Sequence, residues 1–318
     1  TRCLSDWSSD VCSSDLLNEK GWNLVDDRIQ NLMQKIRSKG KPLGEYVSGG
    51  IYYGIKTALN EAFVIDTATK NKLVAEDPKS AEVIKPYLLG KDIKKYQTPE
   101  SDKWLILFPK GFTIKNSGNA SVPENVQEPP PRYGDMPHPD AWYWIRNNYP
   151  AIAKHLIKFK DKAQQRTDKG DFWWELRACD YYSEFEKPKI MLPDIALRCE
   201  ALIDNSGFYC ANTAYIIPEL DEFHLGILNS KLVHFFYSNL TQTIRGGYFR
   251  FIRQYLEQIP IAEVKKNKEM EIKEIVGKII SEKKHPESDT TDLEKEIDSI
   301  VYEIYGLNKE EIRIVEGE

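Results

Sequence analysis

The sequence predicts an α+β fold, in which a mixed β-sheet packs against helices and is followed by a helical tail. Short apolar runs of strand length occur at irregular intervals, without regular alternation with helices. Segments with apolar residues at helical spacing lie between these runs and fill residues 261–318. The chain has 318 residues, with 41% hydrophobic and 29% charged side chains, as in a soluble globular protein of one large or two ordinary domains.

The first residues are expected to be foreign to the protein. Asp6–Leu16 (DWSSDVCSSDL) back-translates into a common sequencing-library adapter, and Thr1-Arg2 fits the bases before a short index. The alternative is a natural tail rich in Ser and Asp. We interpret residues 1–16 as an adapter-derived segment, to be left out of fold reasoning. Authentic sequence then begins near Leu17 without an initiator Met, so we expect an N-terminal part of the protein to be missing.

The charge is distributed unevenly. The net charge is −5, with −2 in residues 1–16 and −6 in residues 261–318, which leaves +3 for residues 17–260. A mildly basic body permits nucleic-acid binding without requiring it.

The cysteines and the hydropathy bear on the compartment. Outside the adapter-like segment the cysteines are Cys179, Cys199 and Cys210, without a CxxC pair, which argues for a reducing cytoplasm. No apolar run is long enough to span a membrane, and the start resembles neither a signal nor a transit peptide.

The N-terminal half predicts one helix followed by strands. Helical spacing predicts an amphipathic helix over 24–38, which would make residues 17–42 a connector from the missing part. Residues 43–53 are predicted as a strand, and Gly49–Asp66 as a strand, a polar turn and an apolar run. Ser80–Leu89 is predicted as a short helix bent or ended by Pro86, and Trp104–Phe108 as a strand.

The remaining elements follow the same patterns. Residues 116–139 are predicted as a proline-rich surface loop. Helices are predicted over Asp140–Asn148, Pro150–Gln165 and Asp221–Asn239, and strands over Phe172–Trp174, Lys189–Leu192 and Phe208–Ile217. In the tail, Thr291 and Glu294 form a predicted capping box, and Gly306 a predicted helix C-cap.

Catalytic signals are weak. There is no convincing nucleophile with a base, and the histidines have no metal-ligand spacing. Pro193-Asp194 followed by Glu200 resembles a nuclease pattern, but Leu202 stands where that pattern needs Lys. No glycine-rich turn of the kind that holds S-adenosylmethionine or a dinucleotide is present.

Two features in the first third of the chain could contact nucleic acid. The turn formed by Lys56, Thr57 and Asn60 could present hydrogen bonds to base edges, since Asn matches adenine and Lys matches guanine. Its alternative reading is an ordinary turn, which the residue chemistry alone favours. A cluster of three lysines could contact phosphates, although a charge run is usually a solvated face. Its members are Lys91, Lys94 and Lys95.

Two further features lie later in the chain. Trp173 and Trp174, with Arg177, could stack on bases, although strand aromatics are more often core residues. The segment Arg245-Gly246-Gly247-Tyr248-Phe249-Arg250, followed by Arg253, is the most specific of the four, because paired glycines let a backbone approach closely between two arginines. A tight turn without a ligand is an equal alternative.

Blocks in order along the chain resemble the TaqI-like C-terminal specificity domain of DNA methyltransferases and type IIG restriction–modification enzymes. These blocks are residues 50–66, 80–96, 104–108, 179–190, 224–237, 245–261 and 289–307. The resemblance implies that residues 43–260 form a target-recognition domain and residues 261–318 a helical tail that packs back on the enzyme. The chain departs from the family at Ala58, where Gly is usual. If that position needs a positive φ, Ala costs about 1 kcal/mol there.

The resemblance also implies a function. An N-terminal domain outside this chain would bind S-adenosylmethionine and methylate adenine N6, and could be fused to a Mg²⁺-dependent nuclease. This chain would bind duplex DNA and would need no cofactor itself. Phosphate contacts are expected from Lys91, Lys94, Lys95, Arg250 and Arg253. Base contacts are expected from the Lys56–Asn60 and Arg245–Tyr248 turns. The alternatives are a specificity subunit or protein-interaction module without its own methyltransferase, and a nuclease built on Asp194 and Glu200.

Overall fold

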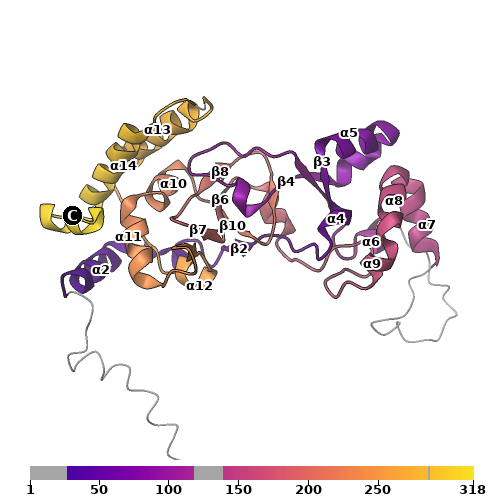
Figure 1. The fold of residues 1–318 in the computed structure, drawn as a ribbon, viewed down its shortest axis with the longest axis horizontal. Coiled ribbons are helices and arrows are strands. Elements are labelled where there is room, and N and C mark those ends of the chain that lie inside the picture. Colours follow the sequence, from indigo (N-terminus) through magenta and orange to yellow (C-terminus); the bar gives the residue numbers. More distant parts are fainter. Residues whose placement is uncertain (1–26, 118–138, 286) are drawn as a thin grey trace, which may run out of the picture.

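A computed structural model describes residues 27–117, 139–285 and 287–318 (Figure 1). The adapter-like segment 1–16 and most of the loop expected over 116–139 lie outside the described residues. The described part is elongated, with one group of helices at each end and β-strands between them (Figure 1). This confirms the α+β fold. No described helix is long and apolar enough to span a membrane.

A four-stranded antiparallel sheet in the order β2-β10-β6-β8 forms the centre. Its strands are β2 (Tyr52–Tyr53), β10 (Ala214–Pro218), β6 (Lys189–Pro193) and β8 (Leu202–Asp204). Along β10, Tyr215 and Ile217 enter one hydrophobic core, whereas Ala214 and Ile216 enter a second. Since alternate side chains of a strand point to opposite faces, this sheet separates the two cores. Burial on both faces explains why β10 and all of β6 after Lys189 are continuous apolar runs.

The second core belongs to the lobe on the right of Figure 1. Its sheet has the order β3-β5-β4-β9, with β4 and β9 parallel and the other pairs antiparallel. The strands are β3 (Val64–Asp66), β5 (Lys103–Ile106), β4 (Ile84–Leu88) and β9 (Tyr209–Cys210). The helices of this lobe are α4 (Asn60–Phe63), α5 (Thr67–Glu76), α6 (Phe112–Asn116), α7 (Pro139–Asn148), α8 (Pro150–Leu156) and α9 (Lys160–Gln164).

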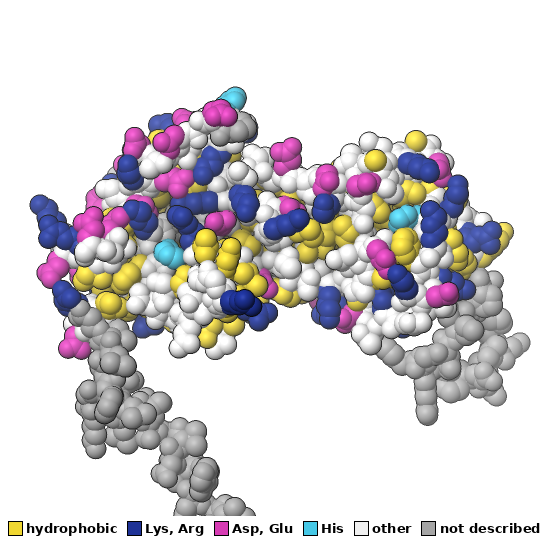
Figure 2. All heavy atoms as spheres, viewed as in Figure 1, with side chains coloured by type: hydrophobic (Ala, Val, Ile, Leu, Met, Phe, Trp, Pro, Cys, Tyr) yellow, Lys and Arg dark blue, Asp and Glu magenta, His cyan; other side chains and the backbone are white. Residues whose placement is uncertain are grey.

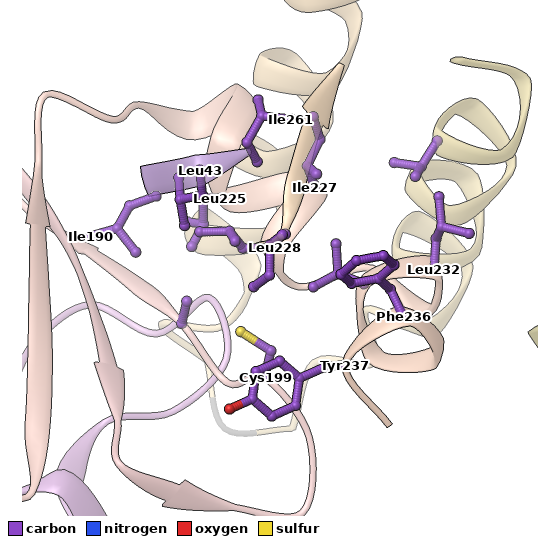
Figure 3. Packing of buried hydrophobic residues seen from close by; sticks show 14 of the residues in the cluster. Leu43, Ile190, Cys199, Leu225, Ile227, Leu228, Leu232, Phe236, Tyr237 and Ile261 are labelled. Atoms are coloured by element: carbon purple, nitrogen blue, oxygen red, sulfur yellow. The ribbon is translucent and has the colours of Figure 1, made fainter. Parts of the chain in front are cut away.

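The first core is covered by the helices on the left of Figure 1. These are α2 (Asp27–Lys39), α10 (Glu222–Leu228), α11 (Lys231–Leu240), α13 (Lys266–Glu282), α14 (Thr291–Ile304) and α15 (Lys309–Glu316). Figure 3 shows Leu225 and Leu228 of α10 between Leu43 and the helix carrying Leu232 and Phe236. Side chains of α13 and α14 belong to this core, so the tail packs as part of the molecule.

Two short antiparallel ribbons complete the strands. In one, β1 (Gly40–Pro42) pairs with β12 (Pro260–Ala262), which places the end of α2 beside the start of the tail. In the other, β7 (Ile195–Ala196) pairs with β11 (Phe249–Arg250).

The strand predicted over 43–53 is wrong for most of its length. Leu43–Tyr46 forms the short helix α3, and only β2 is extended. Ser48 and Gly49 both have positive φ, 50° and 80°, and these two residues turn the chain between α3 and β2.

The helix predicted over Ser80–Leu89 is also wrong. A 3₁₀ helix (η2, Pro78–Val83) is followed by β4, in which Pro86 lies opposite Trp104 of β5. Since β9 pairs only with Tyr87 and Leu88, Pro86 lies outside the stretch of β4 that has a neighbour on both edges. The apolar residues of β4 mimic helical spacing because both faces of the strand contribute to them.

Three other predictions differ in detail. Residues 172–174 form a turn in place of a strand. The strand predicted over 208–217 is two strands, β9 and β10, which belong to different sheets. The helix predicted over 221–239 breaks after Asn229, where the Ser230 side chain accepts a hydrogen bond from Val233 N and caps α11.

The capping box predicted at Thr291 and Glu294 is wrong. The N-cap of α14 is Thr290, which makes no side-chain cap hydrogen bond, and its hydroxyl donates instead to Glu294 Oε1 at 2.9 Å. The predicted C-cap is confirmed. Gly306 has φ 67°, and Leu307 N donates to Tyr302 O, as in a Schellman C-cap. The remaining predicted helices and strands are confirmed, with α8 and α9 separated by one 3₁₀ turn (η4, Ile157–Phe159).

Candidate nucleic-acid interface

The loop from Gly54 to Asn60 leaves the central sheet and enters the right-hand lobe. Gly54 lies so close to the backbone of Ala211 that a Cβ would come within 1.9 Å of its carbonyl oxygen, so only glycine fits. Thr57 is buried, and its hydroxyl donates to Asn60 Oδ1. Lys56, Ala58 and Asn60 are exposed. The structure therefore presents Lys56 and Asn60 outward, and corrects the expectation that the Thr57 side chain contacts a base.

Ala58 adopts the left-handed conformation that glycine favours. Its φ is 55°, one of four positive values among the described residues other than glycine. Position 58 therefore needs a positive φ, which explains why the family usually has Gly there. The alanine at this position is strained by about 1 kcal/mol.

The buried side chain of Arg166 fixes the position of this loop. Its guanidinium is buried and donates to Thr57 O at 2.7 Å, to Trp173 O at 2.7 Å and to Glu175 O at 2.9 Å. The guanidinium also lies over the Phe63 ring, 4.4 Å from its centroid. Burial lowers the pKa of Arg166 to about 10, which leaves it charged at neutral pH. Arg166 therefore fixes the 56–60 loop against the 173–175 turn.

Lys56 and Arg177 share one carboxylate. Lys56 Nζ lies 2.6 Å from Asp168 Oδ2, and Arg177 Nη1 lies 3.8 Å from Asp168 Oδ1. The hydrogen bond from Lys56 lowers the pKa of Asp168 below its usual value. Both cations are half exposed. Lys56 and Arg177 line a small hollow together with Tyr53, Cys179 and Tyr181.

Trp173 and Trp174 do not face this hollow. Their side chains are 6% and 0% exposed, and Trp142 packs against both rings. Trp174 Nε1 donates to Thr113 Oγ1 at 2.9 Å. The expectation that these two indoles stack on bases is corrected, because neither has a free face. Their role is to support the turn that Arg166 holds.

The Arg245–Arg250 segment is an exposed turn leading into β11. Gly246 and Gly247 have φ of 85° and 79°, and a Cβ at Gly247 would meet no atom within 4 Å. Arg245, Tyr248 and Arg250 are exposed. In the described residues neither arginine is ion-paired with a carboxylate. This turn therefore offers two cations and an approachable backbone.

Arg253 has a different environment. Its guanidinium pairs with Glu257 of the same helix, α12 (Arg253–Leu256 and its C-cap), and donates to Gly49 O at 3.2 Å. Arg253 thus ties the turn before β2 to α12, although half of its side chain stays exposed.

The three lysines after β4 divide into two groups. Lys91, in the 3₁₀ turn η3 (Gly90–Asp92), and Lys94 are exposed and make no ion pair within the described chain. Lys95 is mostly buried, with its ammonium 2.6 Å from Glu294 of α14. Lys95 is therefore a link to the tail, and the two outer lysines are the available phosphate contacts.

Tyr53 connects the loop to the β7–β11 ribbon. It lines the hollow beside Lys56, and its hydroxyl lies 3.3 Å from Asp194 Oδ2. Burial, followed by Asp194, raises the pKa of Tyr53 to about 12, whereas Arg250 opposes this rise. Tyr53 thus lies between Lys56, with which it lines the hollow, and the ribbon residues Asp194 and Arg250, which act on its hydroxyl.

The nuclease alternative gains no support from the geometry. Asp194 is 6% exposed, and one of its carboxylate oxygens has no hydrogen-bond partner in the described structure. Neither Asp194 nor Glu200 belongs to a group of three or more His, Cys, Asp or Glu side chains that could share a metal ion, within the residues that the structure describes.

Sequence reasoning missed Arg166 and Asp168. Both lie just after α9, more than a hundred residues from the loop that they contact, and no local pattern distinguishes them. It also missed Ile195 and Leu197, whose exposure is visible only once β7 is placed.

Comparison with known proteins identifies the family. The type II methyltransferase M.MjaIV of Methanocaldococcus jannaschii is 29% identical over 168 residues, 49% of this chain and 56% of that protein. The type II methyltransferase M.BstVI of Geobacillus stearothermophilus is 27% identical over 51% of this chain and 27% of that protein. This chain thus spans little more than half of one relative and about a quarter of the other.

Among solved structures, the type IIL restriction–modification enzyme MmeI in complex with DNA has a similar fold. Its TM-score is 0.56 at 14% identity, with 84% of this chain and 34% of that one covered. The family model of the TaqI-like C-terminal specificity domain matches residues 85–261. The chain therefore belongs to the TaqI-like C-terminal specificity domain family.

Proposed function

We propose that this chain recognises a DNA target as the specificity part of a site-specific adenine-N6 DNA methyltransferase of the type IIG class. The observation that carries the proposal is the exposed turn at Arg245–Arg250, in which two arginines without a carboxylate partner among the described residues flank two left-handed glycines. Membership in the specificity-domain family and the type II methyltransferases among its relatives support it.

The exposed cations divide by their environment. Lys91, Lys94, Arg245 and Arg250 lack carboxylate partners in the described residues and suit phosphates, which position a protein on DNA without reading sequence. Lys56 and Asn60 project from a loop fixed by Arg166, and a rigid support suits base-edge contacts in the major groove.

Catalysis would lie outside this chain. A preceding domain would bind S-adenosylmethionine and receive an adenine flipped out of the duplex. A nuclease fused to that domain would supply any Mg²⁺-dependent cleavage. The chain on its own should transfer no methyl group, which a cofactor-dependent methylation assay on the purified chain would check.

Salt-titrated binding to duplex DNA tests the proposal. Four phosphate contacts predict a slope of log affinity against log salt of about −3.6 and a loss of roughly 100-fold between 50 and 200 mM salt. Replacing Arg245 and Arg250 with Ala should weaken the slope by about two. Binding that is absent, or that does not depend on salt, would overturn the proposal and favour a protein-interaction module.

A further inference from the structure

The β7–β11 ribbon has one buried and one exposed face. Ala196 and Phe249 lie opposite each other, and both belong to the first core. Ile195 lies opposite Arg250, on the other face. Ile195 and Leu197 follow the same alternation and are 49% and 51% exposed. The ribbon therefore presents Ile195 and Leu197 to solvent, whereas Ala196 and Phe249 on its other face pack in the first core.

The adjoining turn extends this apolar surface. Ile244 and Tyr248 are each 42% exposed, and Ile244 N donates to Tyr248 O at 2.7 Å, which closes the turn. Figure 2 shows exposed hydrophobic side chains around the position of β7, with Lys or Arg side chains beside them. We call Ile195, Leu197, Ile244 and Tyr248 the apolar ribbon face. A clustered apolar surface of this kind usually marks an interaction site.

The charges around the apolar ribbon face define its partner. Arg198, Arg245 and Arg250 are exposed, and none is ion-paired with a carboxylate in the described residues. The adjacent acid, Asp194, has its carboxylate buried and turned toward Tyr53. An apolar strip flanked by these arginines is complementary to a partner that has anionic edges and apolar groups between them.

The major groove of DNA has this chemistry. It admits a two-stranded β-ribbon, and phosphates line both of its rims. Its base edges carry hydrogen-bond donors and acceptors, apart from the C5-methyl group of thymine, which is apolar.

We propose that the β7–β11 ribbon enters the major groove with Ile195 and Leu197 against thymine methyl groups and with Arg245 and Arg250 on the flanking phosphates. The assignment rests on the proposed function, since it needs a chain that binds duplex DNA. It makes the apolar ribbon face a determinant of sequence preference at thymine positions.

The test compares thymine with uracil, which lacks the methyl group. The full chain first enriches a random duplex pool, and the enriched pool is then prepared with thymine or with uracil. Wild type should bind the uracil pool about fourfold more weakly for each thymine methyl group that the ribbon would cover. The double variant Ile195→Thr/Leu197→Ser should bind both pools equally, with the salt slope of the wild type because it removes no cation.

Matched controls separate this effect from a general decrease in surface hydrophobicity. Ile157→Thr and Met270→Ser alter side chains that are 43% and 51% exposed on other elements. They should keep the preference for thymine. Thermal unfolding of each variant verifies that it folds. We expect all of them to fold, because the four replaced side chains are exposed.

The outcomes distinguish the two proposals. A chain that shows no salt-dependent DNA binding, or that enriches no sequence from the pool, contradicts the proposed function itself. Enrichment without a thymine preference, or with a preference that the double variant retains, contradicts only the role of the ribbon.

Discussion

Replacing Asp168 with Asn should tighten DNA binding. The carboxylate of Asp168 lies 2.6 Å from Lys56 Nζ and 3.8 Å from Arg177 Nη1, so one carboxylate is ion-paired with both cations. An amide keeps the size of the side chain and removes its charge. Lys56 and Arg177 then become available to phosphates or base edges.

The magnitude follows from the geometry. A phosphate in contact with Lys56 would lie about 6 Å from the Asp168 carboxylate, where repulsion between unit charges in water is about 0.7 kcal/mol. The water value applies because both cations are half exposed. Removing the repulsion should raise the affinity about threefold, and one more available cation should steepen the salt slope by about 0.9.

The assay is salt-titrated binding of wild type and variant to one duplex. Removal of two exposed ion pairs should reduce the free energy of unfolding by at most about 1 kcal/mol, so the variant should stay folded. Asp292→Asn is the matched control, because Asp292 pairs with Lys295 in the tail, and it should leave the affinity unchanged. An affinity for the Asp168→Asn variant equal to or below that of wild type would refute the role given to Lys56 and Arg177.

Three other substitutions test two supports of the 56–60 loop and one buried ion pair of the central sheet through the free energy of unfolding in urea. Arg166→Met removes the donor of the Thr57 and Trp173 carbonyls, whereas Glu175 O still accepts from Gly170 N, and should cost about 3–5 kcal/mol; a cost below about 1 kcal/mol would mean that the 56–60 loop is held by other contacts. Lys189→Met leaves the buried carboxylate of Asp204 without its counter-ion, since both members of this ion pair are 0% exposed. This substitution should also cost about 3–5 kcal/mol, and a cost near zero would show that water replaces the ammonium. Ala58→Gly should add about 0.5–1 kcal/mol by relieving the positive φ, and a destabilised variant would contradict the strain assigned to Ala58.

The sequence allowed prediction of elements that have a single periodicity. Helices α2, α13 and α14 each have one apolar face, and β5 and β6 are short apolar runs between breakers. Periodicity failed at β4 and at the run of β9 and β10. The apolar residues of β4 come from both faces of the strand and fall at helical spacing, and the continuous run of β9 and β10 hides a change of sheet.

The interface could be predicted only in part. Lys56, Arg245 and Arg250 were identified from residue chemistry and family resemblance, and all three are exposed. The indoles of Trp173 and Trp174 were misassigned because aromatic side chains serve cores and stacking equally well, and only the position of Trp142 decides between these roles. Asp168 depends on a contact between distant parts of the chain, which no local pattern encodes.

The β1–β12 ribbon has a consequence for biosynthesis. Gly40 pairs with Ala262, so the strand after α2 has no partner until 222 further residues have been made. At about 5–20 residues per second, this interval lasts roughly 10–45 s. During that time the segment that leads into the domain stays unpaired on the nascent chain. A domain synthesised before this segment would therefore have time to fold before its junction with the specificity domain becomes fixed.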